Sequence, residues 1–280
     1  TGDVAGVRQY IIRAYYFSND FARAKQELMA DLTAKQQAGK TPTIEELQLL
    51  ANTGSKSKDP ATYLVAMENL VRYYPSDDYW SDLLSRTQGK AGYSDRFALD
   101  VLRLQFKAVG TMPPQDYSDM AEIALQNAFP TEAKKVLDAG FAKGVLGTGA
   151  NAAKHKKLRD QANKAAADDA KNIASGEASA MKSKDGTGLI NLGYAFVTMD
   201  QFDKGIDLIQ KGIAKGGLKR PEDAKLRLGY SYAMAGKKDD AIKVLETVKG
   251  GDGVGDLARY WLLWLNRPAT AAAAPAAAAQ

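Results

Sequence analysis

Two Ser-x-x-Lys spacings in this 280-residue chain, Ser55 with Lys58 and Ser179 with Lys182, could in principle support nucleophilic catalysis. On a helix, this spacing places a lysine one turn away from a serine hydroxyl that it could deprotonate. Neither pair is followed by the Lys-Thr-Gly sequence that such serine enzymes also need. The first pair falls in an expected loop and the second in an alanine-rich stretch, so we interpret both spacings as coincidence.

The remaining titratable residues do not form a catalytic or metal-binding set. The chain has one histidine, His155, and no cysteine, so it lacks the converging ligands of a zinc site and the partners of a nucleophile triad. His155 lies in the basic run 154–159, which we expect to be a solvated helix face, with contact to a small anion as the alternative. The sequence predicts a protein that is not an enzyme and has no cofactor and no metal.

The overall composition is that of an ordinary folded protein. Hydrophobic residues make up 45% and charged residues 25%, and the net charge is +5. Lys and Arg are not interleaved with aromatic residues in any long run, which argues against nucleic acid as a partner. There is no stretch of about 18 apolar residues, so we expect no transmembrane segment.

The elements that would position any binding residue are revealed by an internal repeat. Residues 191–213 and 227–248 match at an offset of 36, so that Leu192 and Gly193 correspond to Leu228 and Gly229. A period in this range is typical of stacked helix pairs. Within one period, Leu189, Leu192, Ala195, Phe196 and Met199 follow helical spacing.

A small residue at the expected start of each second helix extends the repeat backwards. These residues are Ala24, Ala66, Ala98, Ala133, Ala170, Gly205 and Ala241. Most successive intervals lie close to 35 residues. The pattern predicts about seven degenerate helix pairs.

This pattern resembles the tetratricopeptide repeat, or TPR. The chain is similar to a bacterial TPR protein whose repeats are degenerate. The Leu-Gly pairs, the aromatic residues Phe196 and Tyr232, and the small residues Gly205 and Ala241 carry the resemblance, which is firm for 187–249. The resemblance implies an all-α fold, a right-handed α-solenoid of about seven TPR-like helix pairs. Earlier units lack the Leu-Gly signature, so only the architecture carries over to them.

The sequence predicts four regions. Residues 1–143 form an N-terminal degenerate TPR-like block, and 144–187, without a single aromatic residue, form an Ala/Lys-rich helical spacer. Residues 188–267 form a C-terminal TPR block with a terminal apolar helix, and 268–280 form a disordered Ala/Pro tail. We expect loosely packed helices in the spacer, because it offers little apolar area to bury.

The TPR resemblance also implies that the first helices line a concave groove for a peptide or partner protein. By position, the predicted partner-binding residues are Arg13, Tyr16, Phe17, Glu122, Gln126, Tyr194, Thr198, Tyr230 and Met234. Exposed Tyr and Met side chains suit adaptable binding of apolar surface. The alternative is that Tyr194 and Tyr230 pack between helices.

Both ends of the array are unusually apolar. Residues 260–265 (YWLLWL) are apolar all round a helix, and 10–17 nearly so. We expect an upstream unit to cover the first helix. For the last helix, with Trp261 and Trp264, we expect a partner, a second copy or the chain's own groove.

Together these features predict a non-catalytic protein interaction scaffold. The alternative is a structural assembly subunit that dimerises or docks through its apolar terminal helices. The absence of cysteine and the Ala/Pro-rich tail favour the bacterial periplasm or cell envelope, with the cytoplasm as the alternative. Because the chain starts at Thr1 rather than Met, we expect a lost leader or a longer parent protein.

Overall fold

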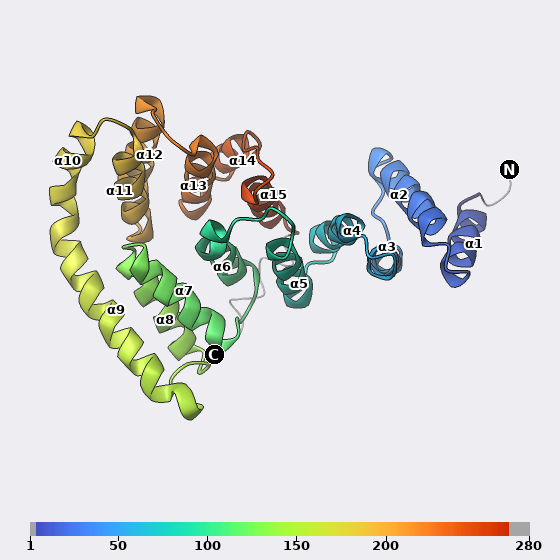
Figure 1. Ribbon diagram of the computed structural model, residues 1–280, viewed down its shortest axis with the longest axis horizontal. Helices are drawn as coiled ribbons and strands as arrows, with labels where there is room; N and C mark the ends of the chain where they lie inside the picture. Colours follow the sequence, from blue (N-terminus) through green and yellow to red (C-terminus); the bar gives the residue numbers. More distant parts are fainter. Residues whose placement is uncertain (1–3, 269–280) are drawn as a thin grey trace. The chain divides into compact units, whose positions relative to one another are not determined.

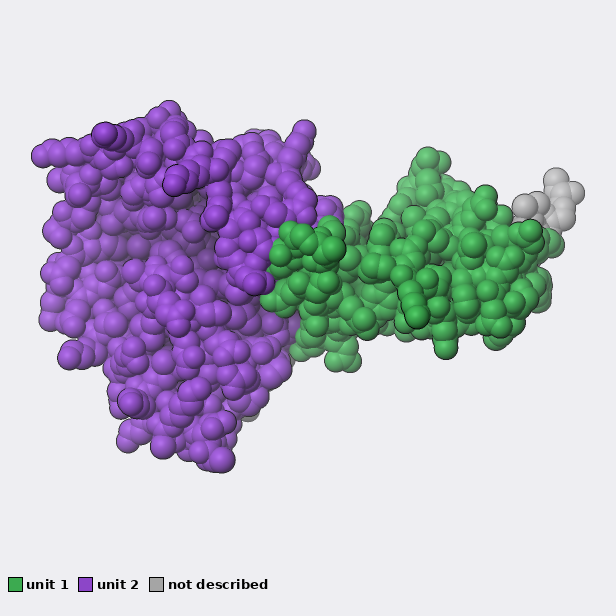
Figure 2. Space-filling model, in the orientation of Figure 1, with its two compact units in different colours: residues 1–93, 266–280 green, residues 94–265 purple. Residues whose placement is uncertain are grey.

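The computed structural model describes residues 4–268, and this part of the chain contains helices and no strands. The predicted all-α class is therefore confirmed. The chain divides into two compact units, residues 1–93 with 266–280 and residues 94–265, which Figure 2 colours separately. We call them the N-terminal unit and the C-terminal unit and describe each by itself.

The N-terminal unit consists of five helices, α1 to α5. They span Val4–Phe17, Phe21–Gln37, Ile44–Lys56, Pro60–Tyr73 and Asp77–Gln88. Polar caps fix where several of them start, since the side chains of Asp20, Thr43, Asp59 and Ser76 each accept a hydrogen bond from the first turn that follows. Each helix packs on the next along the chain, and buried leucines such as Leu28, Leu47, Leu70 and Leu83 fill the space between them.

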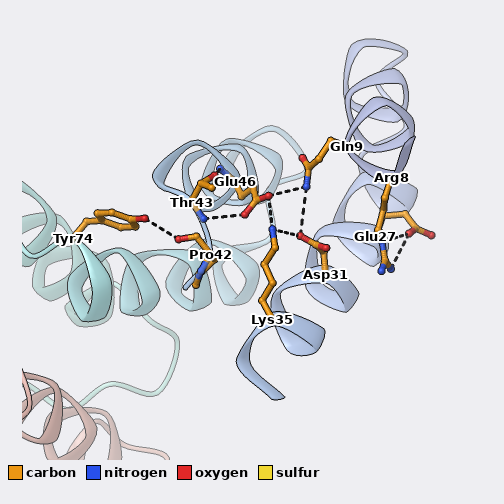
Figure 3. Close-up of polar contacts among 9 residues, drawn as sticks. All are labelled: Arg8, Gln9, Glu27, Asp31, Lys35, Pro42, Thr43, Glu46 and Tyr74. Carbon is orange, nitrogen blue, oxygen red and sulfur yellow. Dashed lines mark hydrogen bonds and ion pairs between the residues drawn. The ribbon is translucent and has the colours of Figure 1, made fainter. Parts of the chain in front are cut away.

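A polar network joins the first three helices of this unit (Figure 3). The Gln9 side chain donates to Glu46 at 2.8 Å, and Lys35 pairs with both Asp31, at 2.8 Å, and Glu46. Glu46 also accepts from the Thr43 N–H at 2.9 Å, which completes the capping box of α3. Partial burial disfavours the charge on Lys35, but the hydrogen bonds to Asp31 and Glu46 outweigh it and raise the pKa of Lys35.

The C-terminal unit contains α6 to α15 and three short 3₁₀ helices. The α-helices span Ala98–Ala108, Pro114–Gln126, Pro130–Ala142, Ala152–Asn172, Glu177–Lys182, Thr187–Thr198, Phe202–Lys215, Pro221–Met234, Lys238–Leu245 and Val254–Leu265. The 3₁₀ helices η1, η2 and η3 span Asp95–Phe97, Gly149–Asn151 and Ile173–Gly176.

The helices of the C-terminal unit follow one another round a closed path, so that α15 returns to pack on α6 (Figure 1). Side chains secure the closure. Arg96 in η1 forms a bidentate pair with Asp223 of α13, at 2.9 and 3.0 Å, and reaches Asp252 at 2.6 Å. The Trp264 indole donates to the carbonyl of Lys107 at 3.0 Å. The first and last helices of this unit are thus directly connected.

The same turn recurs in five helix hairpins, α1/α2, α3/α4, α7/α8, α11/α12 and α13/α14. Each turn has one residue with positive φ, and these are Asn19, Lys58, Ala128, Asp200 and Gly236. In each, the next N–H bonds to the carbonyl five residues back, at 2.8 to 3.0 Å, which is the Schellman closure of a helix end. The first three turns lack the Leu-Gly signature, so the same turn geometry forms without it.

Two glycines explain why the signature persists in α11/α12. A Cβ built on Gly193 would lie 2.5 Å from the carbonyl oxygen of Gly205, and one built on Gly205 would lie 2.5 Å from that of Gly193. The obstacles are backbone atoms, which cannot rotate away as a side chain could. The Leu-Gly pair and the small residue of the next helix are therefore the two halves of one close helix contact.

Two of the predicted helix pairs are not hairpins of this kind. At the third position, α5 ends the N-terminal unit and α6 starts the C-terminal unit, with Ala98 at the beginning of α6 as predicted. At the fifth, Ala170 was expected to begin a second helix, which is wrong. It lies near the end of α9, an uninterrupted helix of 21 residues whose alanine-rich sequence offers no residue to stop it.

The compact units divide the chain between residues 93 and 94, whereas the sequence predicted boundaries at 143, 187 and 267. The segment 144–187 is helical, with α9 packed along α8 through Leu158, Ala162 and Ala166. Its role as a spacer stays a prediction. Of the predicted tail at 268–280, only Pro268 belongs to the described residues, and 269–280 lie outside them.

Candidate binding cavity

Five aromatic rings form a continuous column through the C-terminal unit. Neighbouring rings meet edge to face, with centroids 5.4 Å apart for Phe129 and Tyr194, 5.6 Å for Tyr194 and Tyr230, and 5.2 Å for Tyr230 and Trp261. Trp264 ends the column, 5.4 Å from Trp261. Because the rings come from α11, α13, α15 and the residue preceding α8, the column ties four parts of the unit together by a favourable ring geometry.

A buried arginine from α6 lies against this column. The guanidinium of Arg103 is 4.7 Å from the ring centroid of Tyr194, 5.3 Å from that of Phe129 and 5.8 Å from that of Tyr230. It forms a bidentate pair with Glu132 at 2.7 Å for both bonds, and a third contact to Asp100 at 2.8 Å. Burial disfavours its charge, but Glu132 outweighs this effect and holds the pKa of Arg103 well above its usual range.

The column bears on two expectations about exposure. Tyr194 is 0% exposed and Trp261 is 1% exposed, so neither is accessible to a partner in this structure. Tyr194 was expected to face an open groove or, as the alternative, to pack between helices, and the structure shows the alternative, because Arg103, Phe129 and Tyr230 cover its ring. Trp261 was expected to need an outside partner, a second copy or the chain's own groove. The chain's own helices α6, α13 and α14 pack on α15.

Beside the column lies an open cavity of about 330 Å³. Three predicted groove residues line it, namely Thr198 at the end of α11 and Tyr230 and Met234 from α13. The other lining residues are Arg103, Phe106, Lys107, Met120, Glu132, Lys135, Val136, Val197, Asp200 and Phe202. The cavity is thus lined by side chains from α6, α7, α8, α11, α12 and α13 and from the turn before α12.

The two lysines of the cavity differ in their partners. Lys135 donates to the Thr198 carbonyl at 2.7 Å and pairs with Asp200 at 2.7 Å. No hydrogen bond or ion pair from the Lys107 ammonium is found within residues 4–268, and its contact is with the Phe106 ring, 5.8 Å from the centroid. The surrounding protein desolvates the Lys107 ammonium, and Lys135 repels it, so the pKa of Lys107 is lowered.

The remaining predicted site residues lie elsewhere. Trp264 is partly buried and anchored to α6 through Lys107. Glu122 and Gln126 are on α7 but do not line the cavity, and Glu122 pairs with Lys154 of α9 at 3.4 Å. Thus Glu122 contacts α9 where an open groove was expected.

Arg13, Tyr16 and Phe17 are on α1 of the N-terminal unit. Tyr16 packs edge to face with Phe17 and Phe21, and Arg13 is exposed. Phe17 is 78% exposed, and Tyr10, two turns earlier on the same face of α1, is 76% exposed. The sequence correctly predicted that α1 carries more apolar surface than its own unit covers.

His155 differs from its expected solvated position. It is buried, and its Nδ1 accepts a hydrogen bond from the Gly147 N–H at 3.2 Å, which ties the start of α9 to the preceding loop. Its neighbours Lys154 and Arg159 pair with Glu122 and Asp138. The histidine is a structural contact, and the basic run is partly neutralised by α7 and α8.

Within the described residues, no group of three or more His, Cys, Asp or Glu side chains is arranged to hold a metal ion. Across the same part of the chain, no helix combines the length and apolarity that crossing a membrane requires. The chain matches no protein-family model, and no curated protein matches it in sequence.

Sequence reasoning missed the α6 and α8 side of the cavity. The sequence does contain a signal for Arg103 and Glu132, because Arg103 shares the buried face of α6 with Leu99 and Leu104. A lone arginine on an apolar helix face implies a buried carboxylate elsewhere. Lys107, one helical turn further along, has no comparable signal in the sequence.

Proposed function

We propose that this protein is a non-catalytic interaction scaffold, a degenerate TPR-like α-solenoid whose C-terminal unit binds an apolar segment of a peptide or partner protein. The cavity beside the aromatic column carries the proposal. Three residues that the TPR resemblance places in a groove, Thr198, Tyr230 and Met234, line it together with Met120 and other apolar side chains. Flexible Met side chains and a half-buried Tyr are suited to adaptable apolar contacts.

The recurring turns support the solenoid part of the proposal. The positive-φ residues of the five hairpin turns, at 19, 58, 128, 200 and 236, are separated by 39, 70, 72 and 36 residues, and the intervals of 70 and 72 are each about two periods. Such spacing is expected when one supersecondary unit is stacked repeatedly.

The test uses a photocrosslinking amino acid in place of Met234 and, as a matched control, in place of Met181, which is 51% exposed on α10 and does not line the cavity. We expect a distinct crosslinked protein from position 234 in extracts of the native cells. That protein, purified, should bind the wild type and Met181→Glu but not Met234→Glu. Equal binding by both variants would remove the cavity from the interaction.

A second function, assembly through a terminal helix, is favoured by the uncovered face of α1. Val7, Tyr10, Ile11 and Phe17 are all exposed large apolar residues at helical spacing. Light scattering decides this alternative. A dimer or larger species that becomes monomeric in the double variant Tyr10→Ser with Phe17→Ser would support it, and a wild-type monomer at high concentration would exclude it.

We further propose a bacterial cell envelope location, on the ground of the cysteine-free composition. The cytoplasm is the alternative, and fractionation of the native cells distinguishes the two.

A further inference from the structure

The three cations that line the cavity, Arg103, Lys107 and Lys135, differ in whether a carboxylate neutralises them. Arg103 is paired with Glu132 and Asp100, and Lys135 is paired with Asp200. Lys107, on the α6 side of the cavity, forms no ion pair within residues 4–268 and is the lining cation that remains for an anionic ligand.

The surroundings of Lys107 favour the arrival of an anion. A lysine in a concave, protein-walled site loses part of its hydration, and Lys135 adds repulsion, as the lowered pKa of Lys107 records. A bound carboxylate would reverse both effects, because it replaces lost water contacts with a charge-assisted hydrogen bond. The Thr198 hydroxyl does not compete for this role, since it is committed to the Ala195 carbonyl at 2.7 Å.

The rest of the lining holds no further charged group. Phe106, Met120, Val136, Val197, Phe202 and Met234 supply its apolar part, beside the hydroxyl-bearing Thr198 and Tyr230. A volume of about 330 Å³ lies at the small end of the range for ligand sites, roughly 300–1,000 Å³. The site therefore suits a small apolar body bearing one negative charge and would reject a polyanion.

We propose that the cavity binds an apolar group that carries a single carboxylate, with the carboxylate on Lys107 and the apolar part among Phe106, Met120 and Met234. This inference rests on the proposed function, because it specifies the chemistry that the binding cavity accepts. The group could come from a free aliphatic carboxylate or from a peptide whose carboxylate adjoins a large apolar side chain.

Calorimetry with octanoate and octanamide tests the charge requirement directly. We expect octanoate to bind the intact protein at least tenfold more tightly than octanamide, because a hydrogen bond from a charged donor to a charged acceptor is stronger than one to a neutral amide. Lys107→Gln should abolish this difference, and Lys107→Arg should retain it. The matched control Lys238→Gln, at an exposed lysine in α14 outside the cavity, should leave octanoate binding unchanged.

A second pair of probes separates the two sources of the carboxylate. Two forms of the peptide Ala-Ala-Leu, both acetylated at the amino end, are compared. One has a free carboxyl end and the other an amidated one. Binding of octanoate alone identifies a free aliphatic carboxylate, and Lys107-dependent binding of the free-acid peptide identifies a peptide source. If neither probe binds, or if octanoate and octanamide bind equally, the inference is overturned.

The two proposals can fail separately. If a crosslinked partner binds in a Met234-dependent manner but is indifferent to Lys107→Gln and to excess octanoate, the carboxylate inference is wrong and the scaffold function stands. If octanoate binds through Lys107 while Met234→Glu leaves the partner bound, the cavity is a small-molecule site and the proposed partner interaction is wrong.

Discussion

The N-terminal and C-terminal units use the same hairpin turn but join successive hairpins by different means. In the N-terminal unit, polar side chains such as Gln9, Lys35 and Glu46 reach between helices and remain partly exposed. In the C-terminal unit, the aromatic column and the Arg103–Glu132 pair are buried. Since ion pairs near water contribute at most about 1 kcal/mol each, we expect the N-terminal unit to open first in hydrogen exchange.

The turn and the contacts between hairpins therefore have separate roles in the two units. The turn is present in both units, whereas the aromatic column and the buried ion pair that adjoin the candidate binding cavity are found in the C-terminal unit.

Glu132→Ala should destabilise the C-terminal unit the most. It leaves the buried guanidinium of Arg103 without its bidentate partner, and breaking such a pair costs about 3–5 kcal/mol. Hydrogen exchange should show faster opening of α6, α8 and α13 with α1 to α4 unchanged. The double variant Arg103→Met with Glu132→Leu should recover most of the loss, because it removes both charges. Uniform destabilisation of both units would break the comparison.

Gly193→Ala should also act on the C-terminal unit alone. The added methyl group meets the backbone of Gly205, so α11 and α12 must separate, at a cost of about 1–3 kcal/mol. Gly251→Ala is the matched control, because a Cβ there meets nothing within 4 Å. Urea unfolding followed by Trp fluorescence measures both variants. An unchanged midpoint for Gly193→Ala would contradict the close packing of the two helices.

Asp59→Ala tests the polar side of the comparison. Asp59 caps α4 and accepts from Lys25 at 2.5 Å, so we expect the N-terminal unit to lose about 1 kcal/mol. The hydrogen bond from Lys25, followed by that from the Thr62 N–H, lowers the pKa of Asp59 to about 2. A lowered carboxyl pKa stabilises the fold above about pH 4, and this contribution disappears as the pH falls towards 2. Hydrogen exchange at pH 7 and pH 3 should therefore show a smaller effect of the mutation at the lower pH.

The smallest expected effect concerns the turn that both units share. Ala128 holds a positive φ of 60° that an L-residue with a Cβ disfavours, so Ala128→Gly should stabilise the C-terminal unit by about 0.5–1 kcal/mol. Asn19 holds the same conformation, at 61°, in the N-terminal unit. Because Asn tolerates positive φ, Asn19→Gly should gain less. A thermal denaturation midpoint that rises equally in both variants would show that residue type does not matter in this turn.

Much of the fold could be predicted because the repeat leaves local marks. Gly205 near the start of α12, and Ala24 and Ala133 near the starts of α2 and α8, were found from the spacing of small residues. Only part of the cavity lining could be predicted. Thr198, Tyr230 and Met234 occupy repeat positions, but Arg103 and Lys107 come from α6, a helix that belongs to no clear repeat unit. Whether Tyr194 and Trp261 are exposed depends on what α6 covers, and no local pattern carries that information.

The uninterrupted helix α9 has a further consequence for the C-terminal unit. In the five hairpins a tight turn reverses the direction of the chain, but α9 runs through the place, near residue 164, where the period would put such a turn. Each residue of an α-helix advances its direction by about 100°, so a one-residue deletion in α9 would rotate everything that follows relative to α8. The length of α9 thus sets the phase at which Tyr194 and Tyr230 meet Arg103. We therefore expect that α9 does not tolerate insertions that a surface loop would accept.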